Sequence, residues 1–62
     1  MRELNRRLRE VFIYKINANG LKIKFVAEKL GIEYTTLSKW KNGHLDFGED
    51  KAKKVRNFLE KL

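Results

Sequence analysis

A glycine inside a helical pattern is the feature that most constrains how this chain folds. Residues 26–43 read VAEKLGIEYTTLSKWKNG, and apolar residues recur every three or four positions on both sides of Gly31. This spacing predicts one helix over residues 23–30 and another over residues 34–41. Gly31 supplies the positive φ of a tight turn, where a side chain costs about 1 kcal/mol or more. Two helices of about two turns each, joined this closely, cross at a steep angle.

The same pattern divides this helix-turn-helix between a core and an outer face. Ala27 is small where the two helices approach most closely. The apolar residues that share the core are Val26, Leu30, Ile32, Leu37 and Trp40. Tyr34, Thr35, Ser38 and Lys39 remain on the outer face of the second helix, where they are available to contact a partner.

An amphipathic helix precedes the helix-turn-helix. Its apolar residues recur at three- and four-residue spacing and are Leu4, Leu8, Val11, Phe12 and Ile16. The NANG segment that follows stops this helix near residues 17–19, because Asn and Gly reach the left-handed conformation at low cost. Arg2, Arg6 and Arg9 fall on the opposite side, together with Ile13, and favour a solvated basic face over a specific contact surface.

A last helix follows the NG pair that ends the second helix of the motif. Asp46 and Glu49 fit a capping box in its Asp-x-x-Glu form, which predicts a helix start between them. The apolar positions of this helix are Ala52, Val55, Phe58 or Leu59, and Leu62. A chain of this size supports only one core, because folding buries about 60% of its surface. We therefore expect an all-α bundle of four short helices, forming one domain over residues 1–62.

The charge of the chain indicates a polyanionic partner. Fifteen Lys and Arg residues against eight Asp and Glu residues give a net charge of +7, spread along the whole sequence. The longest uncharged apolar run is VFIY at 11–14, far shorter than the roughly 20 residues that span a bilayer. We expect a cytoplasmic protein that does not enter a membrane.

The sequence offers little for catalysis or metal binding. There is no Cys, and the single His, His44, has no second His with which to hold a metal. The loops NANG and HLDFG lack the spacing of a phosphate-binding loop. We expect neither an enzyme nor a bound cofactor, metal or small-molecule ligand.

The helix-turn-helix segment combines a small residue, a glycine four positions later and five apolar residues at fixed spacing, followed by Asn-Gly. These residues are Val26, Ala27, Leu30, Gly31, Ile32, Leu37, Trp40, Asn42 and Gly43. In this combination the segment resembles the helix-turn-helix of lambda-type Cro and repressor proteins, the Xre family of transcriptional regulators. The resemblance is strong over residues 23–43 and looser over the preceding helix. It implies a small lambda repressor-like DNA-binding domain with its helix-turn-helix at about residues 23–41.

The resemblance further implies which residues contact double-stranded DNA. Helix 34–41 resembles a recognition helix in the major groove, so Tyr34, Thr35, Ser38 and Lys39 would face base edges. Asn42 matches an asparagine that binds phosphate in the family. The further phosphate candidates, chosen by charge and position, are Lys22, Lys24, Lys41 and His44.

The sequence departs from the family pattern at four places. Lys22 and Glu33 stand where relatives place a Ser or Thr helix cap, and Ile23 replaces a Gln that bonds phosphate in many relatives. The phosphate contact at that helix start then comes from Lys22, Lys24 or backbone N–H groups. After Gly43 there is room for one helix where relatives commonly have two, so the family's usual dimer surface is not assured and a homodimer stays open.

These observations favour a Cro-like repressor that reads DNA sequence, of a kind that suits a phage or mobile element in a bacterium. The alternative keeps the fold but makes the protein an interaction module, such as an antitoxin or antirepressor. Phe25, Ile13 and Ile23 motivate that alternative, since Phe25 takes a position that relatives usually make polar. Packing of Phe25 against a neighbouring helix is equally compatible with the sequence.

Overall fold

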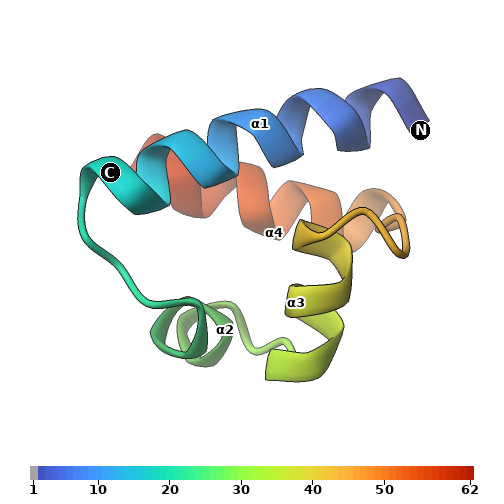
Figure 1. The fold of residues 1–62 in the computed structure, drawn as a ribbon. Coiled ribbons are helices and arrows are strands. Elements are labelled where there is room, and N and C mark those ends of the chain that lie inside the picture. Colours follow the sequence, from blue (N-terminus) through green and yellow to red (C-terminus); the bar gives the residue numbers. More distant parts are fainter. Residues whose placement is uncertain (1) are drawn as a thin grey trace.

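The computed structural model describes residues 2–62, and their side chains from residue 3 onward. Within that range the chain forms four helices: α1 (Arg2–Ala18), α2 (Ile23–Leu30), α3 (Tyr34–Lys41) and α4 (Glu49–Glu60). In Figure 1, α1 and α4 lie side by side as one layer, and α2 and α3 lie together on one side of it. The predicted all-α, lambda repressor-like fold is confirmed, and so are the predicted helices over residues 23–30 and 34–41.

The helices α1 and α4 run in the same direction. Leu4 and Leu8 near the start of α1 line one hollow with Glu49 and Ala52 at the start of α4. Near the other end, Lys15 Nζ donates a hydrogen bond to the Leu59 carbonyl at 3.0 Å. Because the chain has to return between two parallel helices, α2 and α3 form the connection and close the lower side of the core (Figure 1).

The core contains every apolar residue that the sequence assigns to the helix-turn-helix. Val26, Leu37 and Trp40 have no exposed surface, and Ala27, Leu30 and Ile32 are also buried. The other layer contributes Leu8, Phe12, Ile16, Ala52, Val55 and Leu59, and the loop before α4 adds Phe47. The periodicity thus predicts which face of α2 and α3 turns inward.

Two predictions about side chains near the helix ends are wrong. Asp46 and Glu49 form no capping box: Gly48 precedes α4 without a side-chain cap, and the Asp46 carboxylate instead accepts a bond from Arg9. Leu62 lies beyond α4 and is 42% exposed. The motif fails because α4 begins two residues later than a capping box requires: Gly48 is the N-cap and Glu49 is the first helical residue, so neither Asp46 nor Glu49 stands at its capping position.

Two members of the predicted stripe on α1 also differ from expectation. Leu4 is 43% exposed and Val11 is 45% exposed, although their spacing places them beside the buried Leu8. The reason is that α4 covers only part of this stripe, and small Ala52 faces it across the gap. The apolar stripe of α1 is therefore wider than the surface that α4 buries.

The turn between α2 and α3 is built as the sequence predicts. Gly31 has φ 70° and ψ 28°, in the left-handed region. The Ile32 N–H donates to the Ala27 carbonyl, five residues earlier, at 3.0 Å. This is the bond of a Schellman motif, which ends a helix at a left-handed residue. Ile32 is buried directly after the turn, so the same residue closes α2 and joins it to the core.

We expect Gly31→Ala to lower the free energy of unfolding by about 1 kcal/mol, because alanine pays the cost of the left-handed conformation. A Cβ at this position meets no atom within 4 Å, so the cost is purely conformational. Gly48→Ala is the comparison at a negative φ of −73°, where alanine carries only its disadvantage against glycine as an N-cap. Urea denaturation measures both variants, and an unchanged stability of Gly31→Ala would contradict the assignment.

Candidate nucleic-acid interface

A buried cluster around Trp40 holds α3 against the rest of the molecule. The Trp40 ring stacks on Phe47 at a centroid distance of 4.9 Å and packs nearly perpendicular to the Phe12 ring at 5.3 Å. Its Nε1 donates to Asn5 Oδ1 at 2.7 Å. Asn5 Oδ1 also accepts the Phe47 N–H at 2.8 Å, and Asn5 Nδ2 donates to the Phe47 carbonyl at 3.1 Å. One polar side chain of α1 thus positions both α3 and the loop that follows it.

Arg9 belongs to this support and does not lie on a solvated basic face, which corrects the prediction from the sequence. It is partly buried and donates from Nε to the Trp40 carbonyl, at the end of α3. Its Nη2 bonds the Leu45 carbonyl at 3.1 Å and the Asp46 carboxylate at 3.0 Å. A cation at the C-terminal end of a helix stabilises its dipole, so Arg9 fixes the end of α3.

The other residues predicted on that basic face are Arg2, Arg6 and Ile13. Arg6 is exposed and pairs with Glu3 on the same helix, and the side chain of Arg2 lies outside the described residues. Ile13 is 37% exposed. The prediction is confirmed for Arg6 and wrong for Arg9.

The outer face of α3 presents the predicted base-contacting residues together. Tyr34 is 52% exposed, Thr35 and Lys39 are exposed, and Ser38 is half-buried. They occupy adjacent turns of one helix face, because Leu37 and Trp40 fix the opposite face in the core. The outer face of α3 therefore presents hydroxyl, phenol and ammonium donors, while its other face is held in the core.

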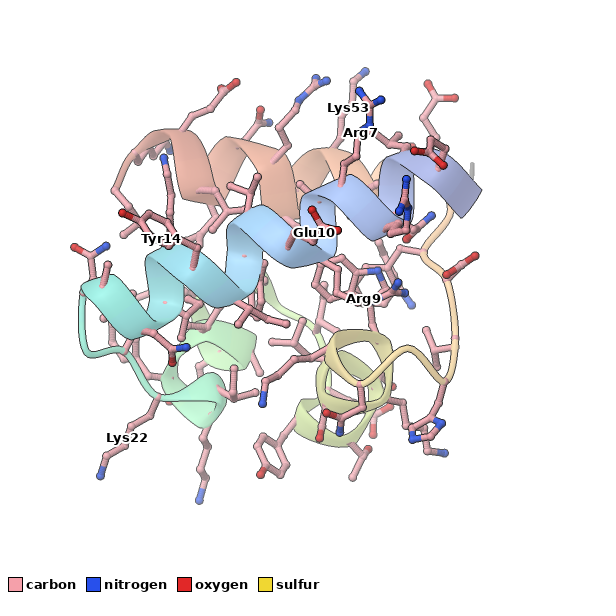
Figure 2. All side chains as sticks on the ribbon, turned by 45° about the horizontal axis from the view of Figure 1, so that its top comes forward. Arg7, Arg9, Glu10, Tyr14, Lys22 and Lys53 are labelled. Atoms are coloured by element: carbon pink, nitrogen blue, oxygen red, sulfur yellow. The ribbon has the colours of Figure 1, made fainter. Side chains whose placement is uncertain are left out.

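The start of α2 brings further positive charge to one end of this face. Lys22, Ile23, Lys24 and Tyr34 line a common hollow, so the two lysines lie beside the start of α3. Both lysines are exposed, and Figure 2 shows Lys22 pointing away from α1 and α4. Neither Lys22 nor Glu33 caps its helix through its side chain. The first N–H groups of α2 therefore remain available beside two ammonium groups.

The other predicted phosphate contacts lie toward the opposite end of α3. Lys41 is half-buried in the last turn, and Asn42 and His44 are exposed just beyond it. His44 shares a hollow with Arg6, Arg9 and Asp46. Since α3 is about 12 Å long, the structure places these candidates in two groups, one at each end of the helix.

Sequence reasoning missed Arg6 as a neighbour of this surface. It lines the same hollow as His44, although it comes from α1. No local pattern reveals this, because all of α2 and α3 lies between Arg6 and His44 in the sequence, and the two residues come together only through the packing of α1 on α3. The i, i+3 spacing of Arg6 and Arg9 was the available signal, and it placed both residues on one side of α1.

Comparison with known proteins now identifies the class of this chain. A family model described as helix-turn-helix matches residues 13–61, which is most of the chain. The chain belongs to the Cro/C1-type helix-turn-helix family, which is a family of DNA-binding regulatory domains. No curated protein and no solved structure matches the chain. Within residues 2–62, no helix is both long enough and apolar enough to cross a membrane.

Proposed function

We propose that this protein is a Cro-like repressor that recognises a specific DNA sequence and acts by occupying an operator. The observation that carries the proposal is the division of α3 into an anchored face and a free face. Leu37 and Trp40 are completely buried, while Tyr34 is 52% exposed. A helix held in this way and displayed by a DNA-binding fold is suited to enter the major groove.

The exposed side chains of α3 suit the base edges of that groove. The Lys39 ammonium group can donate to the O6 and N7 atoms of guanine. The Thr35 and Ser38 hydroxyls can pair with several bases, and the Tyr34 ring or the Thr35 methyl group can meet a thymine methyl. We assign base readout to these four residues.

The residues at the two ends of α3 suit the DNA backbone. We assign phosphate contacts to Lys22 and Lys24 at one end and to Lys41, Asn42 and His44 at the other. Phosphate contacts fix the position of a recognition helix in the groove without reading sequence. If two copies bind together, we expect half-sites about 34–36 Å apart, the pitch of DNA.

Selection from a randomised duplex library at about 150 mM salt tests the proposal, because that ionic strength suppresses contacts that depend on charge alone. We expect enrichment of a defined motif, and its symmetry will show whether one copy or two bind. Retained binding without any enriched motif would overturn the assignment of sequence-specific recognition.

We expect Lys39→Ala to relax the base preference at one position of the selected motif, a change of about 1–3 kcal/mol in discrimination. Affinity for random DNA should change much less, because a base contact contributes little there. Lys53→Ala is the control, since Lys53 lies on α4 and points away from α2 and α3 in Figure 2. Equal losses on specific and random DNA would remove Lys39 from the base-reading set.

A second function rests on an exposed apolar residue. Phe25 on α2 is 44% exposed, with Lys29 Nζ 5.5 Å from the centre of its ring. Of the other two residues that motivated a partner surface, Ile13 is exposed and Ile23 packs partly against the core. We propose, as the alternative, an antitoxin or antirepressor that uses Phe25 to bind a protein. Phe25→Asp should then abolish partner binding while DNA affinity survives.

A further inference from the structure

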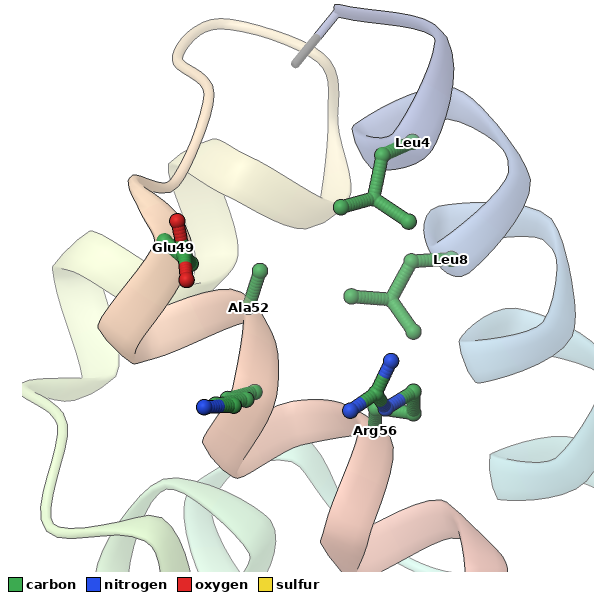
Figure 3. A pocket seen from close by; sticks show the side chains of 6 residues that line it. Leu4, Leu8, Glu49, Ala52 and Arg56 are labelled. Carbon is green, nitrogen blue, oxygen red and sulfur yellow. The ribbon is translucent and has the colours of Figure 1, made fainter.

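A groove between α1 and α4 leaves part of the apolar stripe of α1 uncovered. Leu4, Leu8 and Val11 form one side of it at i, i+4 and i+7 spacing. Ala52 and Leu59 of α4 form the other side. Figure 3 shows Leu4 and Leu8 directed toward α4, with Ala52 opposite and Arg56 farther along the groove. Leu4 and Val11 are half-exposed, whereas Leu8, Ala52 and Leu59 are buried. Exposed apolar side chains gathered along one groove are typical of an interaction surface.

The rim of this groove is positively charged along its middle. Four basic residues line it: Arg7 and Lys15 on α1, and Lys53 and Arg56 on α4. The two acidic residues that line it, Glu49 and Glu60, are the first and last residues of α4 and so mark its ends. The central part of the groove therefore combines an apolar floor with basic walls.

The groove and the proposed DNA surface lie on different sides of the molecule. In Figure 2, Arg7 and Lys53 point away from α2 and α3, whereas Lys22 lies at the opposite side of the view. A partner in the groove and a DNA duplex against α3 can thus be bound together.

We propose that this groove binds an acidic amphipathic helix of a partner protein. The apolar face of such a helix covers Leu4 and Val11, and its flanking carboxylates pair with Lys53 and Arg56. This is the helix-in-groove mode of recognition, in which apolar anchors at i, i+4 and i+7 enter the groove. The twelve residues of α4 give the groove a length of about 18 Å, enough for a partner helix of about three turns.

The charge argues for an acidic partner and against a second copy of this chain. Two copies meeting through this groove bring two basic rims together, on chains that each carry a net charge of +7. Like charges across an interface disfavour association, and opposite charges favour it and steer the encounter. The inference does not depend on the proposed operator binding, since the groove uses none of the residues assigned to DNA.

A displayed library of random 16-residue peptides, selected against the full chain, tests the proposal. We expect enriched peptides to carry apolar residues at i, i+4 and i+7 with Asp or Glu beside them. Fluorescence anisotropy of one labelled peptide then measures binding to Val11→Glu, to the double variant Lys53→Glu, Arg56→Glu, and to the unchanged protein. Both variants should weaken binding at least about tenfold.

The matched control is Ile13→Glu, which places the same charge on a half-exposed β-branched residue of α1 that lies outside the groove. It should leave peptide binding nearly unchanged, and circular dichroism should show that all variants stay folded. The proposal is overturned if no acidic motif is enriched or if Val11→Glu binds the peptide normally. Complete displacement of the peptide by a random DNA duplex would also overturn it, since the peptide would then occupy the DNA surface. A dimer that Val11→Glu dissociates in sedimentation would assign the groove to a second copy instead.

Discussion

Asn5→Ala is expected to lower the free energy of unfolding by about 3–5 kcal/mol, the sum of losses at several buried polar groups. The substitution removes the partner of Trp40 Nε1, of the Phe47 N–H and of the Phe47 carbonyl, which lie around a fully buried side chain. A chain of this size has a total free energy of unfolding of about 3–9 kcal/mol, so this loss is a large fraction of it. Fluorescence of Trp40, the only tryptophan, follows the urea transition directly.

Asn57→Ala is the control for this experiment, because Asn57 is an exposed asparagine on α4. It should change stability by less than about 0.5 kcal/mol, as surface substitutions usually do. If Asn5→Ala proved as mild as Asn57→Ala, the bonds of Asn5 to Trp40 and Phe47 would not be what holds the loop and α3 together.

The part of the fold that the sequence predicts well is the part that local periodicity encodes. The spacing of Val26, Leu30, Leu37 and Trp40 determines which side of each short helix is buried. Gly31 shows where the two helices separate, since its φ of 70° is one that other residues reach only at a cost. These signals act over a few residues, so a single sequence is enough to read them.

The support of α3 was missed because it joins residues far apart in the chain. Asn5 bonds residues 35 and 42 positions away, and Arg9 bonds residues 31 to 37 positions away. A polar residue in an amphipathic helix normally predicts a solvated position. Here Asn5 is buried because the loop that contains Phe47 packs against α1 at this residue. Helical periodicity carries no information about the path of that loop.

The apolar stripe on α1 shows the reverse case, in which residues that the sequence predicts to be buried are partly exposed. Periodicity predicts the direction in which Leu4 and Val11 point, but the area that covers them is set by the packing of another helix. Ala52 is too small, and Arg56 too polar, to bury both residues. Departures of this kind are expected where a surface has a task besides folding, and the two residues lie in the groove for which we propose a partner.

The strength of DNA binding should fall steeply with salt, by an amount that reveals how many copies bind. Three of the proposed phosphate contacts are lysines, Lys22, Lys24 and Lys41. Because each neutralised phosphate releases condensed counterions, one bound copy predicts a slope of log K against log salt concentration of about −2.7, and two copies predict about −5.4. Raising the salt from about 50 to 200 mM then weakens binding about 40-fold for one copy and about 2,000-fold for two.

Removing one of these lysines tests the number of lysine–phosphate contacts in each bound copy. We expect Lys24→Ala to reduce the magnitude of the slope by about 0.9 for each bound copy, on specific and random DNA alike, because a phosphate contact carries no base preference. Lys53→Ala should leave the slope unchanged, since Lys53 points away from α2 and α3 (Figure 2). Anisotropy titrations of one labelled duplex at several salt concentrations give both slopes. An unchanged slope for Lys24→Ala would remove Lys24 from the interface, whereas a loss near 1.8 would mean that two copies hold the duplex, each through its own Lys24.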